Sequence, residues 1–269
     1  MAKIKIAVAG CLGRMGQEIS KQILQNKNLE FVGGFEHKKH KNINKEFNKV
    51  SEIQSSNLIH SNPTPSIKLA NVLIDFTTPQ STLENIKIAS LNKTAVVIGT
   101  TGISGAQKNK IKILSKKIPI LMSSNMSLGV NLLFNLVKQT SSALKETDYD
   151  IEIAETHHKH KKDAPSGTAL SLGDYAALGR KTSLNKSKIL DRTKKLSSRK
   201  KGDIGFSVTR GGEIAGEHTV SFIGENDRVD LVHKANNRSI FVKGALDAAI
   251  FLSKKKSGFF TMNDLLFNK

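Results

Sequence analysis

The sequence predicts a doubly wound parallel α/β sheet, followed by a second α+β domain built on a mostly antiparallel sheet. Short apolar segments alternate with helical segments over residues 1–128, and a glycine-rich turn joins the first strand to the first helix. Strands that alternate with helices are typical of a parallel sheet with crossover helices. A later run of strand-like segments joined by glycine-rich links predicts the second domain.

The elements of the first domain follow from the spacing of apolar residues. Alternating or short continuous apolar runs predict strands at Ile4–Ala9, Leu29–Phe35, Asn71–Phe76, Ala95–Ile98 and Ile118–Met122. Apolar residues at helical spacing predict helices at Met15–Gln25, Ser81–Leu91 and Ala106–Lys116.

The pattern changes after Asn125. A longer helix is predicted at Asn131–Leu144, followed by strands at Asp150–Glu155, Ile204–Thr209, His218–Ile223 and Arg228–Lys234. Gly244–Leu252 returns to a helical pattern, and Asn263–Phe267 closes the chain. The polar stretch Lys181–Lys201 is expected to be a solvated connector.

Composition limits the classes of function. Among 269 residues, 42 Lys and Arg against 23 Asp and Glu give a net charge of +19. The lysines are spread along the chain, so we expect a solvated surface around a pocket for anions, and no nucleic-acid partner. The single cysteine excludes an internal disulfide. No apolar run approaches 18 residues and no signal-peptide core follows the first strand, so we expect no membrane segment and a cytoplasmic location.

A glycine-rich turn stands between the first strand and the first helix. It reads Gly10-Cys11-Leu12-Gly13-Arg14-Met15-Gly16, a variant of the dinucleotide fingerprint. Such glycines let the backbone approach a pyrophosphate at the start of a helix, and Arg14 adds a positive charge. Glu36 follows Gly16 by twenty residues, at the end of the second strand, where a carboxylate can accept hydrogen bonds from a ribose diol. The turn therefore predicts a Rossmann-like, dinucleotide-binding domain.

The residues after Glu36 leave the choice of nicotinamide cofactor open. His37, Lys38, Lys39, His40 and Lys41 could receive the 2′-phosphate of NADPH, whereas Glu36 would repel it. Two later loops follow strands of the same sheet and are candidate walls for the nicotinamide half. They are Gly99-Thr100-Thr101-Gly102 and Ser123-Ser124-Asn125-Met126-Ser127.

A cluster of histidines and lysines is the most informative stretch. His157, His158, Lys159, His160, Lys161 and Lys162 are consecutive, and Ser166-Gly167-Thr168 then opens an apolar, helix-like run. Histidine exchanges protons near neutral pH, lysine supplies a fixed positive charge, and a helix start offers free N–H groups to a carboxylate. This combination predicts a catalytic site for an anionic substrate. A metal site, a nucleic-acid patch and an exposed basic loop are the alternatives, although adjacent strand residues point to opposite faces and are awkward metal ligands.

The stretch Glu155–Leu170 resembles the signature E-x-H-H-x-x-K-x-D-A-P-S-G-T-A of the 4-hydroxy-tetrahydrodipicolinate reductase family, formerly called dihydrodipicolinate reductase. The resemblance extends to Gly13-Arg14-Met15-Gly16, Ile74-Asp75-Phe76-Thr77, Gly99-Thr100-Thr101-Gly102 and Gly216-Glu217-His218. The family reduces a cyclic dicarboxylic imine with NADH or NADPH, with loss of water, in diaminopimelate and lysine biosynthesis.

The resemblance implies roles for individual residues. His157 would donate the proton, and Lys161 would hold or polarise the substrate. His158, Ser166, Gly167 and Thr168 would bind substrate. The cofactor positions would be Gly10, Cys11, Leu12, Gly13, Arg14, Met15, Glu36, His37, Gly99, Thr100, Thr101, Ser123, Ser124, Asn125 and Met126. No metal is implied. His37 stands where some members have an arginine that contacts the NADP phosphate.

The resemblance also implies an organisation and an assembly. Residues 1–128 would bind the dinucleotide, residues 129–238 would bind substrate and mediate oligomerisation, and residues 239–269 would return to the first domain. The family is usually a homotetramer. Two rival functions stay open: a dehydrogenase of another small dicarboxylate, and a non-catalytic NAD(P)-sensing or nucleic-acid-binding protein that uses the +19 charge.

Overall fold

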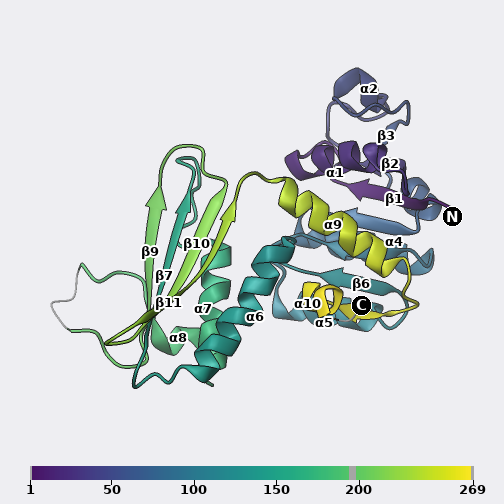
Figure 1. Cartoon of the computed structure of the whole chain (residues 1–269). Coiled ribbons are helices and arrows are strands. Elements are labelled where there is room, and N and C mark those ends of the chain that lie inside the picture. The colour runs from purple at the N-terminus through teal and green to yellow at the C-terminus, as the bar shows by residue number, and fades with distance from the viewer. Residues whose placement is uncertain (1, 194–197, 268–269) are drawn as a thin grey trace. The chain divides into compact units, whose positions relative to one another are not determined.

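The computed structural model describes residues 2–193 and 198–267. The chain divides into two compact units, residues 1–126 with 239–269, and residues 127–238. Each unit is built around its own sheet (Figure 1). Among the described residues, no helix is long and apolar enough to cross a membrane.

The first unit contains a seven-stranded sheet in which every pairing is parallel. Its order is β12-β6-β5-β4-β1-β2-β3. The strands are β1 (Ile4–Ala9), β2 (Leu29–Phe35), β3 (Ile59–His60), β4 (Val72–Asp75), β5 (Ala95–Ile98), β6 (Pro119–Met122) and β12 (Gly258–Phe260). The expected doubly wound parallel sheet is confirmed, and the two edge strands β3 and β12 were not predicted.

Helices cover both faces of this sheet (Figure 1). They are α1 (Arg14–Gln25), α2 (Phe47–Val50), α3 (Thr64–Leu69), α4 (Pro79–Leu91), α5 (Gly105–Leu114), α9 (Ser239–Leu252) and α10 (Met262–Phe267). On one face, Ala7, Leu73 and Val96 pack in a core with apolar residues of α3, α4 and α5. Strand neighbours point to opposite faces, so the equally buried Ile6 and Ile74 point to the other face, where α1 and α9 contact each other.

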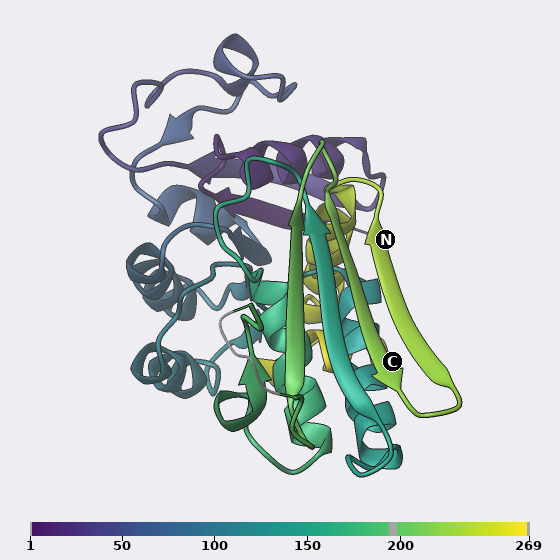
Figure 2. The ribbon, with the colours of Figure 1, turned by 90° about the vertical axis from the view of Figure 1, so that its left-hand side faces the viewer.

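The second unit contains a five-stranded sheet with the order β11-β10-β7-β9-β8. Its elements are α6 (Leu128–Ala143), β7 (Asp150–His157), α7 (Gly167–Gly179), α8 (Leu184–Ser187), β8 (Lys188–Ile189), β9 (Ile204–Arg210), β10 (Gly216–Ile223) and β11 (Arg228–Ala235). Apolar residues of α6 and α7 share one buried core with the sheet. Figure 2 looks onto the face that these helices leave uncovered.

The second sheet is antiparallel over most of its residue pairs, as expected, and it also contains parallel pairings that were not predicted. β10 pairs antiparallel with β7 and β11, whereas β9 pairs parallel with β7 and β8. The chain leaves β7 through α7 and α8 before it reaches β9, and a crossover of that length permits parallel pairing. Part of the expected connector Lys181–Lys201 forms α8 and β8, and residues 194–197 of it lie outside the described residues.

Candidate active site

The glycine turn at the end of β1 is shaped for a close approach of the backbone. Gly10 has φ +66°, in the left-handed region that favours glycine, and the Gly13 N–H donates to its carbonyl at 3.0 Å. A Cβ atom on residue 16 would lie 2.1 Å from the Gly10 oxygen. The first turn of α1 is therefore packed directly against the loop, at a distance that only glycine allows.

The start of α1 differs from the starts of the other long helices with a described N-cap. Thr78, Ser104, Ser127 and Ser166 cap α4, α5, α6 and α7 by accepting a backbone N–H, whereas α1 follows Gly13, which has no side chain. The first N–H groups of a helix lack partners within the helix. At α1 no N-cap side chain occupies them, so they could bind an anion.

Glu36 is bound to the same loop. Its Oε1 accepts the Leu12 N–H at 2.8 Å, and its Oε2 accepts the His37 N–H at 3.3 Å. Arg14 and His37 are exposed, and Met15 is half-buried. Cys11 is buried, and burial raises the pKa of its thiol. The structure therefore gathers the glycine turn and Glu36, while the Cys11 side chain packs inward and only its backbone could face a ligand.

A buried carboxylate organises the loops after β4 and β5. Asp75 is fully buried, and its Oδ1 accepts bonds from the Thr77 N–H (3.0 Å) and from the hydroxyls of Thr77 (2.6 Å), Thr82 (3.1 Å) and Thr100 (3.2 Å). Asn85 donates to Oδ2 at 2.9 Å. Burial raises the pKa of Asp75, against the effect of these donors. The Thr100 side chain is thus committed to this network, so only its backbone could face a cofactor.

The other predicted cofactor positions lie in the same unit. A Cβ on Gly99 would clash with the Phe76 ring at 2.2 Å, and Thr101 is exposed. In the loop after β6, the Ser123 hydroxyl donates to the Asn125 carbonyl at 2.7 Å; Ser124 is exposed and Met126 is buried. The sequence did not predict that Asp75 holds these loops together or that the Phe76 ring packs on Gly99, although both residues lie in a segment that carries the family resemblance.

The second site lies at the carboxyl end of β7. Glu155 and His157 are two residues apart and therefore point to the same face of the strand. The Glu155 Oε2 and the His157 Nδ1 form a hydrogen bond. Glu155 and His157 are 2% and 7% exposed. A Cβ on Gly216 would lie 2.8 Å from His157 Nε2, so the glycine leaves space beside that nitrogen.

Three further groups hold Glu155 in place. Arg210 donates to Oε1 at 2.8 Å and to Oε2 at 3.0 Å, in a two-pronged ion pair, and the Ser166 N–H donates to Oε1 at 2.9 Å. Burial alone would raise the pKa of Glu155, but Arg210, Ser166 and His157 outweigh it and lower the pKa. Burial also lowers the pKa of His157, against the opposing effect of Glu155.

The start of α7 joins this cluster through Ser166. The Ser166 Oγ accepts the Ala169 N–H at 3.1 Å and lies 3.1 Å from His218 Nε2. The His218 ring packs edge-on against His157, with 5.1 Å between ring centroids. Burial, followed by the nearby His157, lowers the pKa of His218 to about 4. His218 is therefore neutral at pH 7.

The remaining predicted substrate residues surround the same strand end. Lys161 forms an ion pair with Asp163 at 2.8 Å, and Lys161 together with the Gly167 backbone lowers the pKa of Asp163. His158 lies 3.2 Å from a nitrogen of Arg238 through its Nε2. Gly167 and Thr168 begin α7. All the predicted catalytic and substrate-binding residues therefore lie together in the second unit.

The donor atoms of Glu155, His157 and His218 lie within 4.8 Å of one another, close enough to hold a metal ion. Both Glu155 oxygens, however, already accept bonds from the guanidinium of Arg210. A cation at this place would face that fixed positive charge. The cluster is better suited to holding a protonated or neutral imidazole than a metal ion. The expectation that no metal binds stays a prediction.

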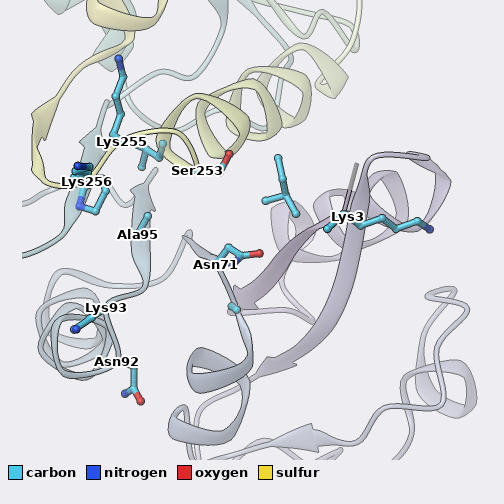
Figure 3. Close-up of a pocket in the computed structure, with 13 residues that line it drawn as sticks. Lys3, Asn71, Asn92, Lys93, Ala95, Ser253, Lys255 and Lys256 are labelled. Carbon is cyan, nitrogen blue, oxygen red and sulfur yellow. The ribbon is translucent and has the colours of Figure 1, made fainter.

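A separate cavity of about 490 Å³ opens at the amino ends of β1, β4, β5 and β6. It is lined by Lys3, Lys93, Lys255 and Lys256 among others, and in Figure 3 the Lys3 side chain extends away from Asn71. The glycine turn, Asp75 and Gly99 lie at the opposite, carboxyl ends of these strands. This cavity is thus not the cofactor site.

Comparison with known proteins identifies the family. The family described as dihydrodipicolinate reductase, N-terminus, matches residues 4–126, and dihydrodipicolinate reductase, C-terminus, matches residues 129–266. The chain belongs to the dihydrodipicolinate reductase family. Proteins named 4-hydroxy-tetrahydrodipicolinate reductase are 39% identical in Polynucleobacter necessarius, over 98% of both chains, and 41% identical in Zymomonas mobilis, again over 98% of both.

A solved structure agrees with this membership. Dipicolinate-bound dihydrodipicolinate reductase from Paenisporosarcina sp. TG-14 superposes with a TM-score of 0.76 at 26% identity, covering 97% of this chain and 99% of that one. The resemblance stated from the motif at Glu155–Leu170 is confirmed. The chain is accordingly a dinucleotide-dependent oxidoreductase with a Rossmann-like domain and a second α+β domain.

Proposed function

We propose that this chain reduces 4-hydroxy-tetrahydrodipicolinate to tetrahydrodipicolinate, with loss of water, in diaminopimelate and lysine biosynthesis. The observation that carries the proposal is His157, held at Nδ1 by a buried carboxylate while its Nε2 faces space left by Gly216. An anion-attracting helix start and Lys161 stand in the same unit. A second dicarboxylate substrate has no observation in its favour.

The first unit is proposed to bind the cofactor. The Gly10–Gly16 turn and the start of α1 would hold the pyrophosphate, and the Gly99–Thr101 and Ser123–Met126 loops would wall the nicotinamide. The bound cofactor supplies a hydride. The uncapped start of α1 and the glycine-only contact at Gly16 support this fit.

Both nicotinamide cofactors are proposed to bind. The Glu36 carboxylate stands at the loop, where the ribose diol of NADH could donate to it. His37, Lys38 and Lys39 are exposed beside it and can turn toward a 2′-phosphate. Lysine suits this role because its flexible stem carries a compact charge.

His157 is proposed to donate the proton that follows hydride transfer. Because Glu155 accepts from Nδ1, Nε2 is the nitrogen that exchanges a proton with the substrate. The same hydrogen bond fixes the ring plane. Because Arg210 and Ser166 also hold Glu155, the donor is oriented before the substrate binds.

The start of α7 is proposed to bind one substrate carboxylate through Gly167 and Thr168. The His218 Nδ1 is buried without a hydrogen-bond partner among the described residues, so its proton belongs on Nε2, where Ser166 Oγ accepts it. Because Ser166 Oγ already accepts two N–H groups, its own proton is left for a substrate oxygen. Lys161 and His158 would bind the second carboxylate. To do so, Lys161 would release its ion pair with Asp163.

The second unit is also proposed to assemble the protein as a homotetramer. The sheet face away from α6 and α7 carries small side chains, among them Ala154, Ser207 and Thr209, which are exposed in the single chain. Figure 2 shows that no helix of this unit covers the face. Sedimentation equilibrium checks the proposal, and a monomer at micromolar concentration would contradict it.

The variant His157→Gln tests the catalytic role. We expect turnover to fall at least 100-fold, because general acid catalysis contributes about 10²–10⁴-fold, with cofactor affinity nearly unchanged. Steady-state rates and cofactor titration measure the two separately. Equal losses in both would remove His157 from the proton-transfer role.

A further inference from the structure

We propose that Arg210 is a positioning residue whose positive charge, held beside His157 by its ion pair with Glu155, keeps His157 acidic, and which also fixes the loop that begins α7. The inference rests on the proposed role of His157 as proton donor. Its first step is geometric. β9 pairs in parallel with β7 so that Arg210 stands opposite His157, and the guanidinium meets the same carboxylate oxygen, Glu155 Oε2, that bonds His157 Nδ1.

The second step concerns charge. Four titratable or charged groups face the imidazole: Glu155 on the same strand, Arg210 on β9, His218 on β10 and Lys161 on the following loop. Glu155 is the only anion among these four, and it is 2% exposed. A buried carboxylate alone would stabilise the imidazolium form of His157. An opposite charge within about 4–6 Å raises the pKa of such a group by roughly 1–3 pH units.

Arg210 offsets that effect. Its two-pronged bond makes the Glu155–Arg210 pair neutral overall. Burial is the largest cause that lowers the pKa of His157, and the charges of Lys161 and Arg210 lower it further. His157 therefore keeps the orientation that Glu155 provides without becoming too weak an acid to release its proton. Glu155 thus orients the ring, while Arg210, together with burial and Lys161, keeps it acidic.

The third step is mechanical. Arg210 also donates to the Asp163 carbonyl at 2.6 Å, two residues before Pro165 and three before Ser166. One guanidinium consequently joins the end of β9, the end of β7 and the loop that leads into α7. A change at Arg210 would therefore disturb substrate anchoring as well as acidity, and the test must separate the two.

The test is a proton-NMR titration of the His157 ring in the full-length protein, with the signal assigned by its loss in His157→Gln. Arg210→Met should raise the pKa of His157 by about one pH unit or more. Arg210→Lys keeps a positive charge and should leave the pKa near the wild-type value, although it loses the two-pronged geometry. Arg192→Met is the matched control, because Arg192 pairs with Glu152 on the same strand β7.

Arg210→Met leaves a buried carboxylate uncompensated and could fail to fold. In that case the test compares Glu155→Gln with the double variant Glu155→Gln/Arg210→Met. Arg210 is present only in the single variant, so the pKa of His157 should be lower there than in the double variant. A wild-type pKa in folded Arg210→Met, or equal pKa values in the Glu155 pair, would overturn the proposal. The same shift in Arg192→Met would also overturn it.

The pH dependence of kcat/KM links the titration to catalysis. If catalysis requires the protonated form of His157, kcat/KM is high at low pH and falls as pH rises through the His157 pKa. In Arg210→Met this fall should occur at a higher pH. If the NMR pKa moves and the kinetic limb does not, the role of His157 as donor fails while the inference about Arg210 holds.

Discussion

The substitution Gly16→Ala tests how closely the first turn of α1 packs on the glycine loop. A Cβ at residue 16 would lie 2.1 Å from the Gly10 oxygen and 2.8 Å from the Cys11 Cα. Real Cβ contacts are essentially never shorter than 3.0 Å. The loop would have to retreat by about 1 Å, and the bonds from the Gly10 and Cys11 N–H groups to the Phe35 carbonyl, at 3.0 and 3.4 Å, oppose that movement.

A displacement of about 1 Å is large compared with a hydrogen bond, so the loop and helix N–H groups would lose their contacts with the pyrophosphate. Overpacking of this kind costs about 1–3 kcal/mol. Binding NADH would require the displaced loop to return to the strained position, so this cost would enter the binding free energy. We therefore expect the dissociation constant of NADH to rise by about 5- to 150-fold, measured by the change in nicotinamide fluorescence on binding or by calorimetry.

Gly105→Ala supplies the matched control. It lies at the first residue of α5, where an added Cβ would meet nothing within 4 Å. Its NADH affinity should equal that of the wild type, and its thermal stability should be equal or slightly higher. A Gly16→Ala protein that binds NADH with wild-type affinity would refute the account of the loop.

Three further predictions concern the cofactor, the substrate and acid stability. Glu36→Ala should weaken NADH more than NADPH, because the carboxylate serves the ribose diol and repels a 2′-phosphate; equal losses in calorimetric titrations would argue against that contact. Lys161→Ala should lower turnover and raise the substrate KM at least 10-fold, whereas the exposed neighbour Lys162→Ala should change neither in steady-state kinetics. Burial lowers the pKa of His218 from about 6.5 to about 4 in the folded protein. The fold therefore has its full stability above pH 6.5, and about 3 kcal/mol of the free energy of unfolding is lost as pH falls toward 4. Urea unfolding at both pH values measures this loss, which should be largely absent in His218→Gln.

The sequence predicted the first sheet well because its signal is local. β4 and β5 are buried throughout, and β1, β2 and β6 are mostly apolar and buried. The helices between them have apolar residues at helical spacing. Helix boundaries differ from the predicted ones where a capping residue decides them. α6 begins at Leu128, before the expected Asn131, because the Ser127 side chain accepts the Val130 N–H at 3.3 Å.

The edge strands and the parallel pairings within the second sheet were not predicted, because they depend on distant segments. β12 has three residues and β3 has two, too few for an apolar period to show. The parallel pairing of β7 with β9 joins segments separated by α7, α8 and β8. No local spacing reports such a register.

The candidate site shows the same division. His157, Lys161 and Ser166 stand in one continuous motif and could be singled out by residue type. Arg210 lies 53 positions after His157 in the chain and reaches Glu155 only through the β7–β9 pairing. Asp75 could be read as the polar end of an apolar strand, but its hydroxyl and amide partners come from α4 and the loop after β5.

The most direct test of the central claim is a coupled assay of the purified full-length protein. The condensation product of pyruvate and aspartate semialdehyde is generated in situ, and the absorbance of reduced nicotinamide is followed with NADH and NADPH in parallel. The account predicts rapid oxidation of both cofactors that depends on the condensation product and is lost in His157→Gln. No oxidation by a folded protein that binds the cofactor would contradict it.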